Sequence, residues 1–264
     1  MLKLYQGRLS VCAVKVRLVL AEKGLDWEPI NLNLRAGEQH KPEYLELNPN
    51  GVVPTLVHDG FVIIESSVIM QYVDDVFAQP PLQPREPRAR VPMRLWMKRI
   101  DEYLHPASAT LTYAMVHGPT MRKKSPAELT AYYAGVPNPI TRARQRAAIE
   151  QGLESPDAAQ ALVFCRSAIA DMERQLESQP WLAGESYSLA DAAMTPYINR
   201  LTMLGLSNMW KGSHPHVTDW FGRILERPSF ATAVDAFAAP ADMQPYAGIE
   251  TWAWEKARSI LAAA

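Results

Sequence analysis

Asn48-Pro-Asn-Gly-Val-Val-Pro54 followed by Thr55-Leu-Val-His-Asp-Gly-Phe-Val-Ile-Ile64 is the stretch that decides how the first part of this chain folds. Two short apolar runs flank His58-Asp59-Gly60, and Asp-Gly between such runs predicts a tight hairpin. A Val-Pro bond just before a strand can be cis. In such a turn the N–H and C=O of Val53 face outward, where an extended peptide can pair with them.

Glu65 and Ser66 follow the hairpin at the start of a helical pattern that extends to about Phe77. Ser66 is the predicted N-cap, and its hydroxyl and the first N–H groups of the helix form a site for a carboxylate. Glu65 beside it supplies the opposite charge for an ammonium group. The pair therefore fits the α-amino acid end of a ligand. The alternative interpretation is a hairpin followed by an ordinary N-cap.

The residues before this stretch predict a βαβ unit. Leu2–Tyr5 alternates as a strand, a helix runs from Ser10 to Gly24, and Trp27–Leu34 alternates as a second strand. Such a unit has parallel strands and a right-handed crossover. A short helix at Pro42–Leu47, the hairpin and the helix after it complete the order βαβαββα. The sequence therefore predicts a thioredoxin-like α/β domain.

The composition changes after residue 78. Five prolines lie between Pro80 and Pro92, a density that does not suit a helix or a central strand. Beyond Met93 the apolar spacing is helical almost throughout. The predicted organisation is an α/β domain at residues 1–78, a proline-rich linker at 79–92 and an all-α domain at 93–264.

Three helix starts in the second part carry capping signals: Ser125-Pro-Ala-Glu128, Ser155-Pro-Asp157 and Ser188-Leu-Ala-Asp191. The last one precedes an apolar helix predicted at Ala192–Leu204. Pro106 predicts a kink in the first long helix of this part. These residues are therefore expected to stabilise helix ends rather than to take part in catalysis.

Composition narrows the class of protein. The chain has 264 residues, 48% of them hydrophobic, which is enough for a large core. Its 27 basic and 28 acidic residues nearly cancel, so we expect no nucleic acid partner and no attraction to an anionic membrane. The six histidines are too scattered to suggest a metal site. Two cysteines, no signal sequence and no spanning segment lead us to expect a cytoplasmic protein.

The quoted motifs resemble those of the cytosolic glutathione transferases, whose N-terminal domain is thioredoxin-like. The segment Ser10-Val-Cys-Ala-Val-Lys-Val-Arg17 is similar to that of the serine-type, theta-like members. The sequence between Glu65 and Tyr103 is especially similar to that of bacterial β-aryl-etherase-type transferases. These enzymes cleave ether bonds of lignin-derived aromatics with glutathione. The resemblance spans nearly the whole chain.

This resemblance implies a set of glutathione-binding residues. Val53 binds through its backbone and Pro54 shapes the turn, while Glu65 and Ser66 hold the γ-glutamyl end. The Gln39-His40 pair matches the pair that contacts the glycyl end in theta-like members.

The resemblance also implies a homodimer, because Asp101 matches the acidic residue that reaches across the dimer interface to the ammonium group of glutathione. A surface carboxylate is the alternative interpretation of Asp101.

Catalysis in this family requires a thiolate from a thiol whose ordinary pKa is near 8.5. Ser10 stands where a loop meets a helix, so its hydroxyl and the helix dipole both favour a negative sulfur. A plain N-cap is the alternative. Cys12 lies in the first turn and offers a redox mechanism through a mixed disulfide. In cysteine-type relatives, however, the cysteine stands where Ser10 stands. Cys165 is interpreted as a buried apolar thiol.

The sequence therefore predicts a glutathione transferase that conjugates or cleaves an apolar, aromatic electrophile with glutathione as co-substrate and without a metal. The expected electrophile pocket belongs to the helical domain, near Tyr113 and Met115. Two alternatives remain at this point: a glutathione-dependent disulfide or peroxide reductase that uses Cys12, and a binding protein that keeps the fold without turnover.

Overall fold

The computed structural model describes residues 1–263, which form two compact units. Unit 1 comprises Met1–Lys98, Gln179–Pro196 and Trp220–Asp242. Unit 2 comprises Arg99–Ser178, Tyr197–Asp219 and the residues from Met243 onward. Both units therefore combine segments that are far apart in the sequence. Within residues 1–263, no helix has the length and apolar character that a bilayer crossing requires.

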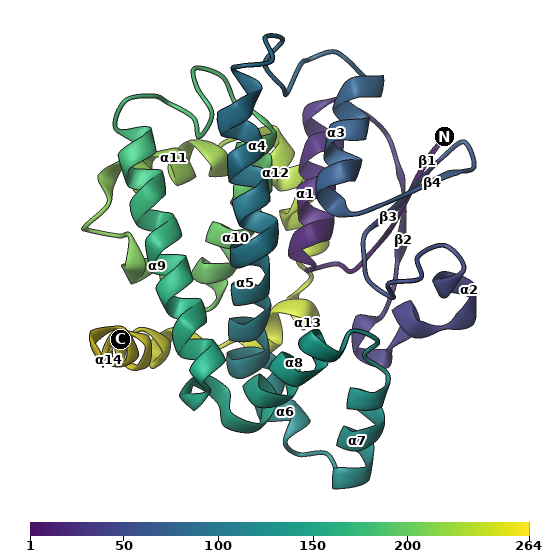
Figure 1. Ribbon diagram of the computed structural model, residues 1–264, viewed down its shortest axis with the longest axis vertical. Helices are drawn as coiled ribbons and strands as arrows, with labels where there is room; N and C mark the ends of the chain where they lie inside the picture. The colour runs from purple at the N-terminus through teal and green to yellow at the C-terminus, as the bar shows by residue number, and fades with distance from the viewer. Residues whose placement is uncertain (264) are drawn as a thin grey trace. The chain divides into compact units, whose positions relative to one another are not determined.

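Unit 1 contains a four-stranded mixed sheet with the strand order β2-β1-β3-β4. The strand β1 pairs parallel with β2 and antiparallel with β3, and β3 pairs antiparallel with β4. The helices α1 and α3 pack against each other beside this sheet (Figure 1). The predicted order βαβαββα is confirmed. The elements are β1 (Leu2–Gln6), α1 (Val11–Glu22), β2 (Glu28–Asn31), α2 (Pro42–Leu45), β3 (Thr55–His58), β4 (Phe61–Ile64) and α3 (Ser66–Val76).

The hairpin between β3 and β4 has the predicted two-residue loop. Asp59 and Gly60 both have positive φ angles, 49° and 88°, as a type I′ turn requires. On β1 the alternating residues Leu2 and Leu4 are buried, and Leu56 opposes Leu4 in the register. The alternation that predicted these strands therefore does mark their buried positions.

The strand β2 is shorter than predicted, because it ends at Asn31 rather than Leu34. The side chain of Asn33 accepts a hydrogen bond from the N–H of Ala36 at 3.2 Å and caps the 3-10 helix η1 (Leu34–Ala36). A short polar side chain that bonds to its own backbone competes with strand pairing. A second 3-10 helix, η2 (Glu38–His40), follows at once.

The proline-rich segment after α3 is tied to unit 1. Lys23 and Asp74 form a buried ion pair, the Asp74 carboxylate accepts the N–H of Leu82 at 2.8 Å, and the Lys23 ammonium donates to the carbonyl of Pro80 at 2.5 Å. The helix α4 (Arg90–Arg99) begins earlier than predicted and includes Pro92 in its first turn. Proline is tolerated there because the first N–H groups of a helix lack partners within it.

Later segments complete unit 1. The carboxylate of Glu22 at the end of α1 accepts two hydrogen bonds from Arg227, at 2.6 and 2.7 Å, and one from the hydroxyl of Ser229 at 2.5 Å. These residues lead into α12 (Pro228–Ala233), which packs on α1. The 3-10 helix η7 (Asp235–Phe237) and the start of α13 (Pro240–Met243) follow.

The buried carboxylate of Asp191 fixes the start of α10 (Leu189–Met203). One oxygen accepts the N–H and the hydroxyl of Ser188, at 3.0 and 2.9 Å. The other accepts the N–H of Leu182 and the indole N–H of Trp220, both at 2.9 Å. The predicted Ser-x-x-Asp cap is present, although the helix begins at Leu189 rather than Ala192, and its carboxylate also binds the helix α11 (Pro215–Leu225) through Trp220.

Unit 2 is helical. Ser125 and Glu128 form the predicted capping box, and the Ser155 hydroxyl accepts the N–H of Ala158 at 3.1 Å. A π-helical turn ends at Leu104, two residues before Pro106, where a kink was predicted. The helices that lie wholly within unit 2 are η3 (Ile100–Leu104), α5 (His105–Thr112), η4 (Tyr113–His117), α6 (Gly118–Met121), α7 (Pro126–Ala134), α8 (Pro139–Gln151), η5 (Gly152–Glu154), α9 (Pro156–Leu176), η6 (Ser207–Met209), η8 (Gln244–Tyr246), η9 (Ile249–Thr251) and α14 (Ala253–Ala263).

Candidate active site

Strand register brings the predicted site residues of unit 1 to one edge of the sheet. Gln6, the last residue of β1, pairs with Asn31, the last residue of β2. Tyr5 pairs with Thr55, the first residue of β3, and Thr55 pairs with Ile64, the last residue of β4. Four loops therefore leave the sheet at the same edge: residues 7–10, 32–41, 48–54 and 65–66.

Ser10 lies at the predicted junction of loop and helix, where it is the N-cap of α1. Its backbone is extended, and its hydroxyl oxygen accepts the N–H of Ala13 at 3.3 Å. The half-buried side chain uses its oxygen as an acceptor, so the hydroxyl proton can still be donated to a ligand. The positive end of the α1 dipole adds to the favourable field for an anion here.

The Val53–Pro54 peptide bond is cis, as the sequence suggested. The turn is held through the carbonyl of Val52, which accepts the hydroxyl of Tyr44 at 2.7 Å and the side-chain amide of Asn48 at 2.8 Å. In residues 1–263 the backbone N–H and C=O of Val53 form no hydrogen bond. The two groups that were predicted to pair with a peptide are thus available.

Glu65 has an unusual backbone conformation for a residue other than glycine, with φ 67° and ψ 110°. Such a conformation costs about 1–3 kcal/mol and is concentrated at ligand sites. The exposed Glu65 side chain accepts a hydrogen bond from the amide of Asn50 at 3.4 Å. This contact joins the loop before β3 to the start of α3.

The prediction that Ser66 caps α3 is wrong. Glu65 is the N-cap, and Ser66 is the buried first residue of the helix. The chain turns into the helix one residue earlier because the carbonyl of Glu65 already accepts the N–H of Ile69 at 2.8 Å. Within the described chain no cap hydrogen bond comes from the Glu65 side chain. The first N–H groups of α3 therefore face the same edge of the sheet without a capping side chain.

Gln39 and His40 lie in η2, next to the loop that precedes β3. A Cβ atom added to Gly51 would lie 3.0 Å from Cδ2 of His40, and Gly51 has φ +62°, so glycine allows this close approach. The Gln39 amide nitrogen lies 3.4 Å from Nε2 of His40. Among the described residues the buried Oε1 of Gln39 has no hydrogen-bond partner. Burial lowers the pKa of His40, so the neutral imidazole is favoured.

The two cysteines lie at different depths. Cys12 is the second residue of α1 and is half-buried. Cys165 is fully buried in α9, and burial raises the pKa of its thiol to about 12, which confirms the interpretation of an apolar thiol.

Asp101 is exposed in η3 and belongs to unit 2, as do Tyr113 and Met115 of η4. The structure thus brings together the predicted residues of unit 1, while the role of Asp101 stays a prediction.

Sequence reasoning missed two fully buried cations of α1, Lys15 and Arg17. The ammonium of Lys15 donates to the hydroxyl of Ser67, the second residue of α3, at 2.9 Å. A charged residue at each of two positions within an otherwise apolar helix was the available signal, because such residues are almost never buried unless they have partners.

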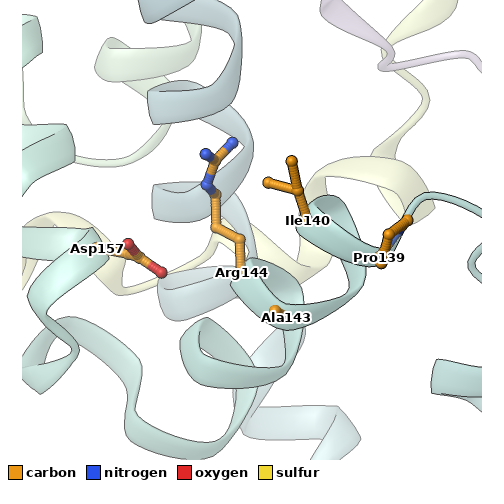
Figure 2. Close-up of a pocket in the computed structure, with 5 residues that line it drawn as sticks. All are labelled: Pro139, Ile140, Ala143, Arg144 and Asp157. Carbon is orange, nitrogen blue, oxygen red and sulfur yellow. The ribbon is translucent and has the colours of Figure 1, made fainter.

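A surface hollow of about 390 Å³ in unit 2 contains none of the predicted site residues. Figure 2 shows Pro139, Ile140, Ala143 and Arg144 on α8, with Asp157 at the start of α9 across from them. Nearby, Arg146 forms an ion pair with Glu150 at 2.9 Å. Arg146 and Glu150 are exposed, so this ion pair lies on a solvated part of α8.

Comparison with known proteins identifies the fold and the family. The family model described as "Glutathione S-transferase, N-terminal domain" matches residues 1–75, and the one described as "Glutathione S-transferase, C-terminal domain" matches residues 151–228. Protein LigF from Sphingobium sp. strain SYK-6 is 32% identical over 236 residues, which are 86% of this chain and 91% of that protein. The chain belongs to the glutathione S-transferase family.

Solved structures agree with this family. The beta-etherase LigF from Sphingobium sp. strain SYK-6 superimposes with a TM-score of 0.81 at 30% identity, covering 89% of this transferase and 99% of that chain. Glutathione transferase F7 from Populus trichocarpa gives a TM-score of 0.72 at 25% identity, with 90% and 100% covered. The predicted family, fold class and enzyme class are confirmed. Residues 76–150, which include α6, α7 and all of α8 except Gln151, lie outside both family models.

Proposed function

We propose that this transferase binds glutathione at the shared edge of the unit 1 sheet and uses the thiolate to attack an apolar, aromatic electrophile. The observation that carries the proposal is the convergence of the four loops. They bring a hydroxyl donor at Ser10, an available backbone at Val53 and a strained acidic residue at Glu65 to one edge. This combination suits a γ-glutamyl peptide that carries a thiol.

Each part of glutathione has matching groups in this proposal. The γ-glutamyl carboxylate binds the first N–H groups of α3 and the hydroxyl of Ser66, and its ammonium binds Glu65. The cysteinyl backbone pairs with Val53, whose position is set by Pro54. The glycyl carboxylate binds Gln39 and His40. Because the neutral form of His40 is favoured, its contact is a hydrogen bond rather than an ion pair.

The thiol proton leaves to solvent, and the hydroxyl of Ser10 donates a hydrogen bond to the resulting thiolate. The sulfur then forms a bond to an electrophilic carbon. Either an addition product results, or a leaving group departs with its bonding electrons; in an aryl ether that group is a phenolate. Relatedness to a protein whose name is beta-etherase supports the aromatic substrate class and the cleaving reaction.

Isothermal calorimetry and a panel of aryl electrophiles test this proposal. We expect glutathione to bind in the millimolar range or better, and at least one electrophile to be consumed with the appearance of a glutathione conjugate. Binding without turnover across the panel would instead support a binding protein that retains the fold. An absence of glutathione binding would contradict both.

We also propose that the protein is a cytoplasmic homodimer and needs no metal. The α/β domain at residues 1–78 binds glutathione, residues 79–92 are the linker, and residues 93–264 contribute the electrophile pocket. Exposed apolar side chains of unit 1 support a second copy as partner: Val52, Phe61, Val62 and Val68 are each at least 37% exposed. Asp101 would then reach the ammonium of the glutathione bound to the partner. Sedimentation equilibrium distinguishes a dimer from a monomer.

A glutathione-dependent reductase is the second candidate, and the half-buried Cys12 in the first turn of α1 is the observation that favours it. In that reaction the Cys12 thiolate attacks the glutathionyl sulfur of a mixed disulfide between glutathione and a substrate thiol, forms a disulfide with glutathione and releases the substrate thiolate. A glutathione thiolate then attacks this disulfide, which regenerates the Cys12 thiolate and releases glutathione disulfide.

We expect Cys12→Ala to keep its conjugating activity within about twofold, because Ser10 and not Cys12 faces the sulfur in our proposal. The activity is measured with the electrophile that the panel identifies. Mass spectrometry after treatment with glutathione disulfide is the matched measurement, with Cys165→Ala as the control for the buried thiol. A mixed disulfide on Cys12 together with loss of disulfide reduction in Cys12→Ala would favour the reductase.

A further inference from the structure

Arg17 of α1 is a fully buried cation beneath the loop that leads to Ser10. The Cα–Cβ bonds of a helix tilt toward its N-terminus, and seven residues are about two turns, so the Arg17 side chain extends toward the Ser10 end. The guanidinium donates three hydrogen bonds: from Nε to the carbonyl of Ala233 at 2.6 Å, from Nη1 to Oε1 of Gln6 at 2.9 Å and from Nη2 to the carbonyl of Arg8 at 2.8 Å.

All three acceptors of Arg17 are neutral. The ring of Phe237 covers the guanidinium, with its centroid 4.0 Å from Cζ. The neighbouring Arg8 forms its own ion pair with Asp242 at 2.7 Å. Burial, and secondarily the charge of Arg8, lowers the pKa of Arg17 to about 9. The guanidinium therefore stays charged at neutral pH.

The charged groups on the elements packed around Arg17 have other partners or face solvent. Lys15 on α1 donates to the hydroxyl of Ser67, and Glu22 accepts from Arg227. Asp74 on α3 pairs with Lys23. Asp235 on η7 is exposed. Within residues 1–263, Arg17 is thus a buried cation whose hydrogen bonds all go to neutral acceptors, and a buried charge without a counter-ion is costly.

We infer that Arg17 is a positioning residue for thiol ionisation: it fixes the loop at residues 6–8 and supplies a positive field to a thiolate held at Ser10. The inference rests on the proposed function, which places that thiolate. A charge in a dry environment acts over a longer range than one in water. The sulfur of bound glutathione is then the counter-charge of Arg17.

The test is the ionisation of glutathione on the enzyme, followed by the ultraviolet absorbance of the thiolate against pH. We expect Arg17→Met to raise the midpoint by about one pH unit, because it removes the charge and keeps the apolar stem. Arg17→Lys keeps the charge and should retain most of the lowering. Affinity for S-methylglutathione, which has no thiol to ionise, should stay within about twofold in both variants.

A third variant changes the positive field at the thiolate from a position outside the core. Asp242→Asn removes the carboxylate beside Arg8, leaves two cations near the loop and should lower the midpoint by a few tenths of a pH unit. A folded Arg17→Met with an unchanged midpoint overturns the inference. Should Arg17→Met not fold, Arg17→Gln, which keeps hydrogen-bond donors without the charge, is measured instead, and an unchanged midpoint in that variant overturns the inference. A wild-type enzyme that never ionises glutathione below pH 8.5 contradicts the proposed function itself, so the two failures are distinguishable.

Discussion

Replacing Ser10 by alanine should reduce kcat/KM about a hundredfold near neutral pH and shift the pH limb of turnover up toward 8.5, the ordinary pKa of a thiol. The hydroxyl of Ser10 accepts from Ala13, and its own proton is the donor that we assign to the sulfur. Without that donor the thiolate is less stable, while the contacts to both ends of glutathione remain. The KM for glutathione should therefore change much less than kcat. Steady-state kinetics across the pH range give both values.

The matched control is Ser155→Ala. Ser155 caps α9 with the same kind of hydrogen bond that Ser10 makes at α1, at 3.1 Å to Ala158, but it belongs to unit 2. Each variant loses a cap worth about 1 kcal/mol. Only Ser10→Ala should change the pH limb. An equal loss of kcat/KM in the two variants would show that Ser10 acts only as a helix cap.

The second large effect concerns stability. Asp191→Ala should lower the free energy of unfolding by about 4 kcal/mol, because four buried donors lose their acceptor at once. They are two N–H groups, the hydroxyl of Ser188 and the indole of Trp220. For a chain of this size the melting temperature should fall by roughly 10 °C. Differential scanning calorimetry measures the shift.

Glu128→Ala is the control for Asp191→Ala. Glu128 belongs to the same Ser-x-x-acid motif at the start of α7, where both side chains are exposed. Its loss should lower the melting temperature far less than Asp191→Ala does, since water replaces the lost partner. A similar cost at the two sites would show that the cap, and not the buried hydrogen-bond network, determines the effect at Asp191.

The elements that were predicted correctly are those that local chemistry decides. Asp59-Gly60 allows the two positive φ angles of the turn, and Ser125 with Glu128 forms a cap within four residues. One error is also local: the side chain of Asn33 caps η1 and ends β2, in competition with the strand alternation. The other error concerns Glu65, which adopts a positive φ angle that no local pattern indicates.

The residues of the candidate site could be predicted one by one, but the buried contacts that hold them in place could not. The motif around Val53 and Pro54 and the serine ahead of α1 are recognisable in the sequence. The role of Arg17, in contrast, depends on contacts with Ala233 and Phe237, which lie more than two hundred residues later in the chain. No periodicity reveals which distant carbonyl accepts a buried guanidinium.

Unit 1 has a consequence for biosynthesis, because its last segment ends at Asp242. When the first 98 residues have left the ribosome, Glu22 still lacks Arg227 and Arg17 still lacks the carbonyl of Ala233. Glu22 would then lack its cationic partner, and Arg17 would keep only its hydrogen bonds to Gln6 and Arg8. We expect the ligand site to mature late in translation, so that a fragment ending after the first family domain would be a poor substitute for the complete enzyme.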